Sequence, residues 1–377
     1  MDFTAALLDT AERLERAERS WSAFIGFDGF VDEIVHAVST RQSPDAYTPI
    51  PTMAAFAKRV GDAAGLSTNI EIVPDQVKLG GNGPIMARAL VELGAQITYV
   101  GSVGHPEIHP VFAELARTCT VVGVCEPGYT LALEFEDGKL MLGKTISLTD
   151  LTWARILERF PLEAMRAAVG RSALVAALNW TMIPYLTEVW EGLLRDCLPA
   201  LPAGARPFAF FDLCDPAKRE DRELVRAIAT IERFSEHTRP VLGLNRKEAT
   251  EVADALGIRL SPSNEAAPLA EIAEALGRRI GVAGVVVHPT REAAVYMDGR
   301  LHAVSGPYTS RPKLTTGAGD NFNAGFCFGL VHGFDPRACL ILGKGTSGFY
   351  VRNGRSPSRA ELAEFLRRWA ESADAEF

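Results

Sequence analysis

Residues 315–325 read Thr-Thr-Gly-Ala-Gly-Asp-Asn-Phe-Asn-Ala-Gly, a glycine-rich turn that leads into an amphipathic stretch, with one carboxylate, Asp320, at the junction. Small residues let backbone N–H groups converge on an anion, and a helix that begins near Asp320 adds its unpaired amides and the positive end of its dipole. Such a site suits phosphoryl transfer, in which positioning and charge neutralisation supply most of the catalysis. The alternative is an ordinary helix start, in which Asp320 caps the free amides.

A second glycine turn occurs far upstream. Residues 80–90 read Gly-Gly-Asn-Gly-Pro-Ile-Met-Ala-Arg-Ala-Leu, and Gly94 is typical of a helix stop. The two motifs, in this order, resemble those of the ribokinase family of sugar and nucleoside kinases, also called the PfkB family, over residues 23–366. The resemblance implies a ribokinase-like three-layer α/β/α sandwich, with a mainly parallel central sheet and a small β lid over the acceptor substrate.

The pattern of the whole chain agrees with an α/β fold, because short apolar runs alternate with helical patterns. Two segments break the alternation: residues 27–38 continue the first strand with period two, and residues 129–146 read as a hairpin. A surface hairpin is the simpler interpretation, but the resemblance implies that both segments form the lid. We therefore expect an N-terminal helical extension at 1–22 and a kinase domain at 23–377 with lid segments near 27–38 and 129–146. The expected strands of the main sheet are 23–27, 96–101, 173–178, 207–213, 241–244, 282–288 and 293–296.

The composition of the 377 residues excludes several classes of protein. The formal net charge is −8 and no Lys/Arg cluster stands out, which argues against nucleic acid as a main partner. No apolar run approaches the ~20 residues that span a bilayer, and the first 20 residues lack the uncharged core of a signal peptide. We expect a cytoplasmic protein without membrane contact, and the lid segments suggest a homodimer.

The resemblance gives the glycine-rich turn a catalytic role. It assigns Asp320 as the base that accepts the proton of the acceptor hydroxyl, and it assigns Gly317, Ala318 and Gly319 as the anion hole for the transferred group. A carboxylate at a helix N-terminus is expected to have a lowered pKa. Its position would then count for more than its basicity.

Metal-binding residues are expected after two apolar strands. Asn245 and Glu248 have the spacing of a capping box, and the resemblance implies that Glu248 positions Mg²⁺ and water near the phosphates. One carboxylate is sufficient because Mg²⁺ usually keeps several waters. Asp215 belongs to an Asp-Pro dipeptide typical of the family and is assigned to the metal with Glu248, although the sequence alone does not decide between Asp212 and Asp215.

Asp28 and Asp32 lie four residues apart where a strand leaves the sheet. A carboxylate accepts hydrogen bonds from two adjacent hydroxyls and so favours polyols, although surface acids are the alternative. The resemblance assigns acceptor binding to Asp32, with Asp28 second. It adds the glycine turn to the acceptor site: Gly80, Gly81 and Asn82.

Three departures from the family pattern bear on the ligands. Ile85 stands where many relatives have an asparagine that touches the sugar, and Leu314 replaces an aspartate that helps to hold a monovalent cation, so potassium activation is not expected. Residues 287–291, Val-His-Pro-Thr-Arg, replace a Thr-x-Gly stretch that borders the nucleotide. Arg291 could compensate by reaching a phosphate, or it could be an ordinary surface arginine. The nucleotide side is assigned to Asn245, Thr316, Arg291 and Asn353.

The expected activity is transfer of the γ-phosphate of ATP, with Mg²⁺, to a hydroxyl of a sugar-like or nucleoside-like molecule. One alternative is an ADP-dependent sugar kinase of the same superfamily, and another is a catalytically silent sugar-binding regulator. A dinucleotide-dependent dehydrogenase is disfavoured, because no Gly-x-Gly-x-x-Gly follows the first strand.

Overall fold

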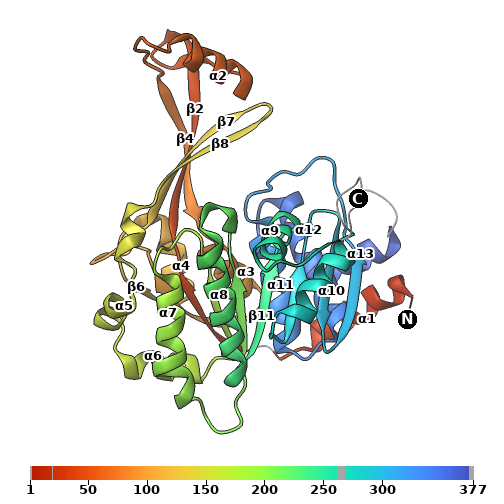
Figure 1. The fold of residues 1–377 in the computed structure, drawn as a ribbon. Helices are drawn as coiled ribbons and strands as arrows, with labels where there is room; N and C mark the ends of the chain where they lie inside the picture. Colours follow the sequence, from red (N-terminus) through yellow and green to blue (C-terminus); the bar gives the residue numbers. More distant parts are fainter. Residues whose placement is uncertain (1, 19, 261–267, 373–377) are drawn as a thin grey trace.

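The computed structural model describes residues 2–18, 20–260 and 268–372. A central sheet covered by helices forms the body, and a smaller sheet extends away from it (Figure 1). The central sheet has nine strands in the order β14-β13-β12-β11-β10-β9-β1-β5-β6. Its strands are β1 Trp21–Phe27, β5 Ala95–Gly101, β6 Thr120–Gly123, β9 Leu174–Leu178, β10 Phe208–Asp212, β11 Arg239–Leu244, β12 Gly284–Val287, β13 Glu292–Met297 and β14 Arg300–Ser305.

The strand pairing decides where a ligand site can form. From β12 to β6 all neighbouring strands are parallel, and only β13 and β14 at one edge run antiparallel. All seven strands expected from the sequence are present, so the mainly parallel sheet is confirmed, whereas β6 and β14 were not expected. Because parallel strands share one direction, the loops that follow β1, β9, β10, β11 and β12 meet along the same edge.

Helices bury apolar side chains on both faces of the sheet, which makes the three layers. Along β1, for example, Ile25 belongs to one core and Phe24 to the other, as the alternation of side chains in a strand requires. The first core is covered by α1 Phe3–Arg16, α3 Asn82–Glu92, α4 Ala113–Thr118, α11 Ala318–Val331, α12 Pro336–Asn353 and α13 Arg359–Glu371. The second is covered by α5 Trp153–Arg159, α6 Leu162–Gly170, α7 Leu186–Gly192, α8 Asp221–Arg233, α9 Arg246–Ala255 and α10 Leu269–Arg279.

The smaller sheet, here called the lid sheet, has the order β3-β2-β7-β8, with β4 also paired to β2. It contains the expected hairpin, and a helix packs at its far end (Figure 1). That helix contributes to a small third core, in which the rings of Phe56 and Phe135 lie 5.5 Å apart. The elements are β2 Phe30–Ser43, β3 Ala46–Pro49, β4 Ile72–Gly80, β7 Gly128–Phe135, β8 Gly138–Lys144 and the helix α2 Met53–Asp62.

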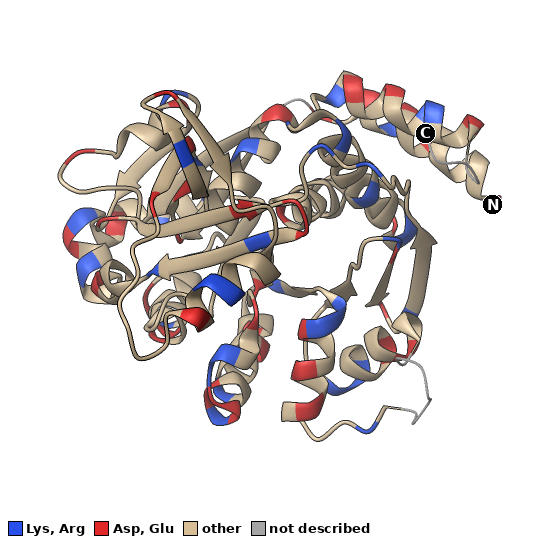
Figure 2. Ribbon diagram, turned by 90° about the horizontal axis from the view of Figure 1, so that it is seen from above, with Lys and Arg blue, Asp and Glu red and all other residues tan. Residues whose placement is uncertain are grey.

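Charged residues of both signs are interspersed along the outer helices (Figure 2). Pairs one helical turn apart include Lys58 with Asp62 and Arg278 with Glu274, both at 2.7 Å. Exposed pairs of this kind contribute about 0.3–0.5 kcal/mol each, so they add little to stability. Within the described ranges, no helix combines the length and apolar character needed to cross a bilayer.

The helix α1, which the sequence suggested as an extension, contributes to the first core. Its residues Leu7 and Leu14 are fully buried at the spacing of one helix face. The ring of Phe3 meets that of Trp369 on α13 edge to face, with centroids 5.5 Å apart. The first and last described helices therefore pack against each other.

We predict that Leu7→Ala lowers the free energy of unfolding by about 2–5 kcal/mol, because it leaves a cavity in the first core. Its neighbour Leu8 is 43% exposed. Leu8→Ala is therefore a matched control that should change stability by less than about 1 kcal/mol. Chemical denaturation of both variants measures the difference. Equal effects at the two positions would show that α1 is not part of the core.

Candidate active site

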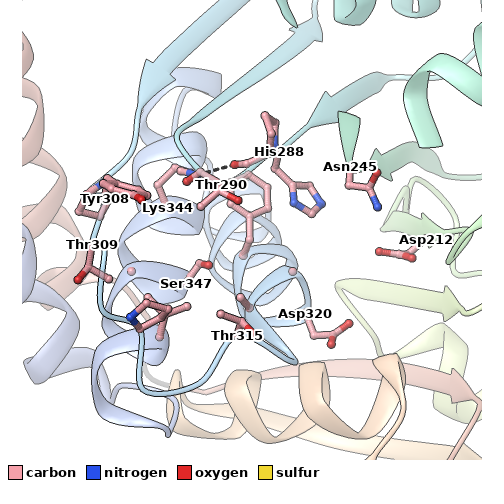
Figure 3. A pocket seen from close by; sticks show the side chains of 18 of the residues that line it. Asp212, Asn245, His288, Thr290, Tyr308, Thr309, Thr315, Asp320, Lys344 and Ser347 are labelled. Carbon is pink, nitrogen blue, oxygen red and sulfur yellow. Dashed lines mark hydrogen bonds between the residues drawn. The ribbon is translucent and has the colours of Figure 1, made fainter. Parts of the chain in front are cut away.

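A first cavity of about 400 Å³ opens where the loops at the carboxyl edge of the sheet meet the starts of α3 and α11. Figure 3 shows polar side chains from several of these elements around the same space. They come from segments that are far apart in the sequence. The polar lining includes Asn82 of α3, Asp212 at the end of β10, Asn245 and Glu248 at the start of α9, His288 after β12 and Asp320 of α11.

The glycine-rich turn forms one wall of this cavity. Gly317 has a left-handed backbone (φ +90°) and precedes α11, and a Cβ at this position would lie 2.8 Å from the hydroxyl of Tyr350. Only glycine fits both conditions. Ala318 and Gly319 follow in the first turn of the helix and line the cavity. The N–H of Ala318 donates to the carbonyl of Thr315 at 3.1 Å, so the amide of Gly319 is the one that the start of the helix offers to an anion.

Asp320 is 8% exposed and lines the same cavity. The expectation of a lowered pKa was wrong. Burial, followed by the negative charges of Asp212 and Asp28, raises the pKa of Asp320 well above its ordinary value. Desolvation of the carboxylate therefore outweighs the helix dipole, and a raised pKa makes Asp320 a stronger base than its position in the helix suggested.

Two further carboxylates, Asp212 and Glu248, line the same cavity. Asp212 accepts hydrogen bonds from Nδ2 of Asn323 at 2.9 Å and Nδ2 of Asn82 at 3.4 Å. Glu248 forms the expected capping box with Asn245, whose N–H donates to it at 2.8 Å. Burial raises the pKa of both carboxyls, and for Asp212 the charge of Glu248 adds to the effect. Such a concentration of negative charge favours a bound cation.

Asp215 does not line this cavity. The chain has left-handed backbone at both Cys214 and Asp215, and the Asp215 side chain is held by salt bridges to Lys247 and Lys218. Asp215 supports the site only through its backbone N–H, which donates to the carboxylate of Glu248 at 3.0 Å. The structure thus places Asp212, and not Asp215, where a ligand in the cavity would be.

A second cavity of about 650 Å³ lies between the lid sheet and the body. Asp32 of β2 faces it, directly opposite Lys78 of β4, and accepts a hydrogen bond from Thr130 of β7. A side chain at Gly80 would collide with the Asp32 carboxylate, which explains the first glycine of the upstream motif. Burial raises the pKa of Asp32. The second cavity therefore has a carboxylate and an ammonium on the lid side.

The glycine-rich turn separates the two cavities. Thr315 lines the first cavity and Thr316 the second. The next residue, Gly317, packs against Tyr350 and Ile85, which both line the second cavity. A ligand in either cavity would thus lie beside the same turn.

Asp28 has a structural position. It is fully buried in the link between β1 and β2, and it lines neither cavity. Its carboxylate accepts from the N–H groups of Asn82 and Gly83, each at 2.8 Å, and from Nδ2 of Asn179 at 2.7 Å. Burial raises the pKa of Asp28 to about 6, against the effect of these hydrogen bonds. Gly81 beside it has φ +100° and leaves no room for a side chain.

The residues assigned to the nucleotide side are dispersed. Asn245 lines the first cavity, and Thr316 lines the second, where its carbonyl accepts from the hydroxyl of Tyr350 at 2.8 Å. Arg291 lies over the ring of Tyr308, 3.5 Å from its centroid, and Asn353 donates to the carbonyl of Phe349 at 2.8 Å. Neither Arg291 nor Asn353 lines either cavity.

Sequence reasoning missed Lys344, Lys78 and Tyr350, and it gave His288 no role. Lys344 is a single lysine in the apolar helix α12, and its ammonium donates to the carbonyls of Pro289 and Thr290. A charged residue within an otherwise buried helix was the one signal available in the sequence.

Comparisons with known proteins agree with this geometry. The family model described as prokaryotic ketohexokinase matches residues 2–369. The chain is 32% identical over 352 residues to a ketohexokinase of Haloferax volcanii, covering 93% of this chain and 92% of that protein.

Solved structures show the same fold at low identity. A nucleoside kinase of Methanocaldococcus jannaschii, a member of the ribokinase family, has a TM-score of 0.59 at 13% identity and covers 93% of this chain and 99% of its own. A ribokinase of Thermotoga maritima has a TM-score of 0.58 at 15% identity, covering 93% and 100%. The ribokinase-like α/β/α fold is confirmed. The chain belongs to the prokaryotic ketohexokinase family and is a carbohydrate kinase of the wider ribokinase (PfkB) family.

Proposed function

We propose that this carbohydrate kinase transfers the γ-phosphate of ATP to a hydroxyl of a ketohexose. The observation that carries the proposal is the meeting of two cavities at one turn, with Asp320 and the amides of α11 at the junction. The nucleotide occupies the first cavity and the sugar the second. The ketohexose is supported by the name of the Haloferax volcanii relative.

The acceptor is held from the lid side. Asp32 accepts hydrogen bonds from adjacent hydroxyls of the sugar, and Lys78 across the strand pair donates to another of its oxygens. Lid segments near 27–38 and 129–146 close over it, within a kinase domain that covers 23–377. Water is thereby kept from the phosphoryl group, which limits hydrolysis of the nucleotide.

Asp320 then removes the proton from the acceptor hydroxyl as the oxygen attacks the γ-phosphorus. A new P–O bond forms, the bond between the γ-phosphorus and the bridging oxygen breaks, and ADP leaves with the electron pair. The turn formed by Gly317, Ala318 and Gly319 stabilises the charge on the transferred group, and the amide of Ala318 exchanges its bond to the carbonyl of Thr315 for one to the phosphate. The proton ends on Asp320, whose raised pKa favours this step.

Magnesium fits the residues of the first cavity. Among the described residues, no group of three or more Asp, Glu, His or Cys side chains is arranged to hold a metal alone. Mg²⁺ needs few protein ligands, since phosphates and water complete its shell, and the buried Asp212 and Glu248 carboxylates supply the charge. When bound, the ion neutralises the phosphate chain.

A coupled assay of ADP release tests the proposed function. D-fructose, D-glucose, D-ribose and adenosine are compared as acceptors with ATP, and the best acceptor is repeated with ADP as donor. We expect kcat/KM for fructose with ATP to exceed the others by at least tenfold, which is about 1.4 kcal/mol of discrimination. A preference for ribose or adenosine, or for ADP as donor, would refute the proposal.

Asp320→Asn is predicted to lower kcat by on the order of 10²-fold or more, because the amide does not accept the proton. Nucleotide affinity, measured by calorimetry, should change by less than about threefold, since the backbone amides remain. Turnover within a few-fold of wild type would remove Asp320 from the role of base.

The assignment of the metal is tested by a matched pair. Asp212→Asn should raise the Mg²⁺ concentration for half-maximal activity by about tenfold, because a buried charge that faces the cavity is lost. Asp215→Asn removes a carboxylate charge from the salt bridges outside the cavity. It should change the Mg²⁺ concentration for half-maximal activity by less than about twofold. The reverse result would place the metal beside Asp215.

A further inference from the structure

The loop after β12 has no role in the mechanism above, although it borders the first cavity. Its sequence, Val-His-Pro-Thr-Arg at residues 287–291, lacks the family's glycine. The guanidinium of Arg291 lies over the ring of Tyr308, which lines the cavity, whereas Arg291 itself does not line it. His288, three residues earlier, lines the cavity, and Figure 3 shows its imidazole on the side that Asn245 and Asp212 also face.

The His288 ring lies against the first turn of α11. It stacks on Phe322, with centroids 4.3 Å apart and planes at 19°. A Cβ at Gly319 would lie 3.6 Å from Cε1 of His288, which is ordinary contact distance. The imidazole is therefore next to the amides that form the proposed anion hole.

One nitrogen of this ring is unsatisfied. Nε2 of His288 has no exposed surface and no hydrogen-bond partner among the described residues. A buried polar atom without a partner costs about 1–3 kcal/mol, so such an atom in a ligand cavity points to a ligand. Burial, with the nearby charge of Lys344, lowers the pKa of His288 to about 3. The ring is thus neutral and carries a single N–H.

Lys344 holds the loop that carries the histidine. Its buried Nζ donates to the carbonyls of Pro289 and Thr290, each at 2.8 Å. A side chain at Gly306 would collide with the Lys344 stem, so that glycine makes room for the clamp. Lys344 of α12 therefore fixes the backbone of the loop, whereas the imidazole of His288 is held by its stacking on Phe322 of α11.

We propose that His288 binds the phosphate chain of the donor nucleotide, with Nε2–H donating to an oxygen of the terminal phosphates. The proposal rests on the proposed function, which places the nucleotide in this cavity. In the ligand-free ring, a bond to the backbone carbonyl of His288 favours the tautomer with the proton on Nδ1. A phosphate oxygen as partner shifts the proton to Nε2, and because the ring lines the cavity, a small turn of it presents that proton. A neutral donor adds a hydrogen bond without adding positive charge beside Lys344. His288 thus takes the role that the sequence suggested for Arg291.

Calorimetric titration of the full-length protein with Mg²⁺-ADP and with adenosine tests the assignment. His288→Leu keeps an apolar side chain against Phe322 but has no N–H, whereas His288→Gln keeps an N–H donor. We expect His288→Leu to weaken ADP binding by about 10- to 100-fold, as loss of a hydrogen bond to a charged group does. Adenosine binding should stay within about twofold, and His288→Gln should retain ADP binding within a few-fold of wild type.

His302→Leu is the matched control, because His302 lies on β14 and lines neither cavity. It should leave both affinities unchanged. Thermal unfolding of each variant identifies any that is not folded, and His288→Asn is then the second variant for the same comparison. Equal losses for ADP and adenosine, equal losses in the Leu and Gln variants, or no loss at all would overturn the role of His288. Failure of the wild type to bind ADP or ATP would instead refute the proposed function.

Discussion

A single buried carboxylate, that of Asp28, holds together the parts on which both cavities depend. It lies where β1 passes into the lid, and it accepts hydrogen bonds from the start of α3 and from Asn179 after β9. The first lid segment, from β2 to β4, leaves the body at Asp28 and returns to it at Gly81, so both of its ends meet at this side chain. Three donors offset part of the cost of burying the charge, and removing any one would raise that cost.

The electrostatics of the site follow from its position at the carboxyl edge of the sheet. In a chain with a formal net charge of −8, the acids Asp212, Glu248 and Asp320 gather around one cavity. Burial raises the pKa of all three, and the charges of Asp212 and Glu248 add to the effect at Asp320. The opposing positive potential comes from the N-terminal ends of α3 and α11 and from Lys344. In the proposed complex, the cation would neutralise the carboxylates and the phosphates would neutralise the helix ends and Lys344. Neither the nucleotide nor the cation would neutralise both kinds of charge alone.

Much of the fold and of the site could be predicted from the sequence, because both depend on patterns of neighbouring residues. The apolar runs located seven strands, and the small residues around Asp320 located the turn between the cavities. Features that depend on the tertiary structure could not be predicted. Two left-handed residues turn Asp215 away from the cavity, burial overrides the dipole at Asp320, and the role of Lys344 appears only when α12 packs beneath a loop from β12.

The contact between α1 and α13 has a consequence for the synthesis of the chain. The apolar face of α1, with Leu7 and Leu14, is translated long before its partner around Trp369. Domains generally form during translation from the N-terminal side. Here α1 has to wait, with part of its apolar face uncovered, until α13 has been translated, so closure of the first core is a late step of folding.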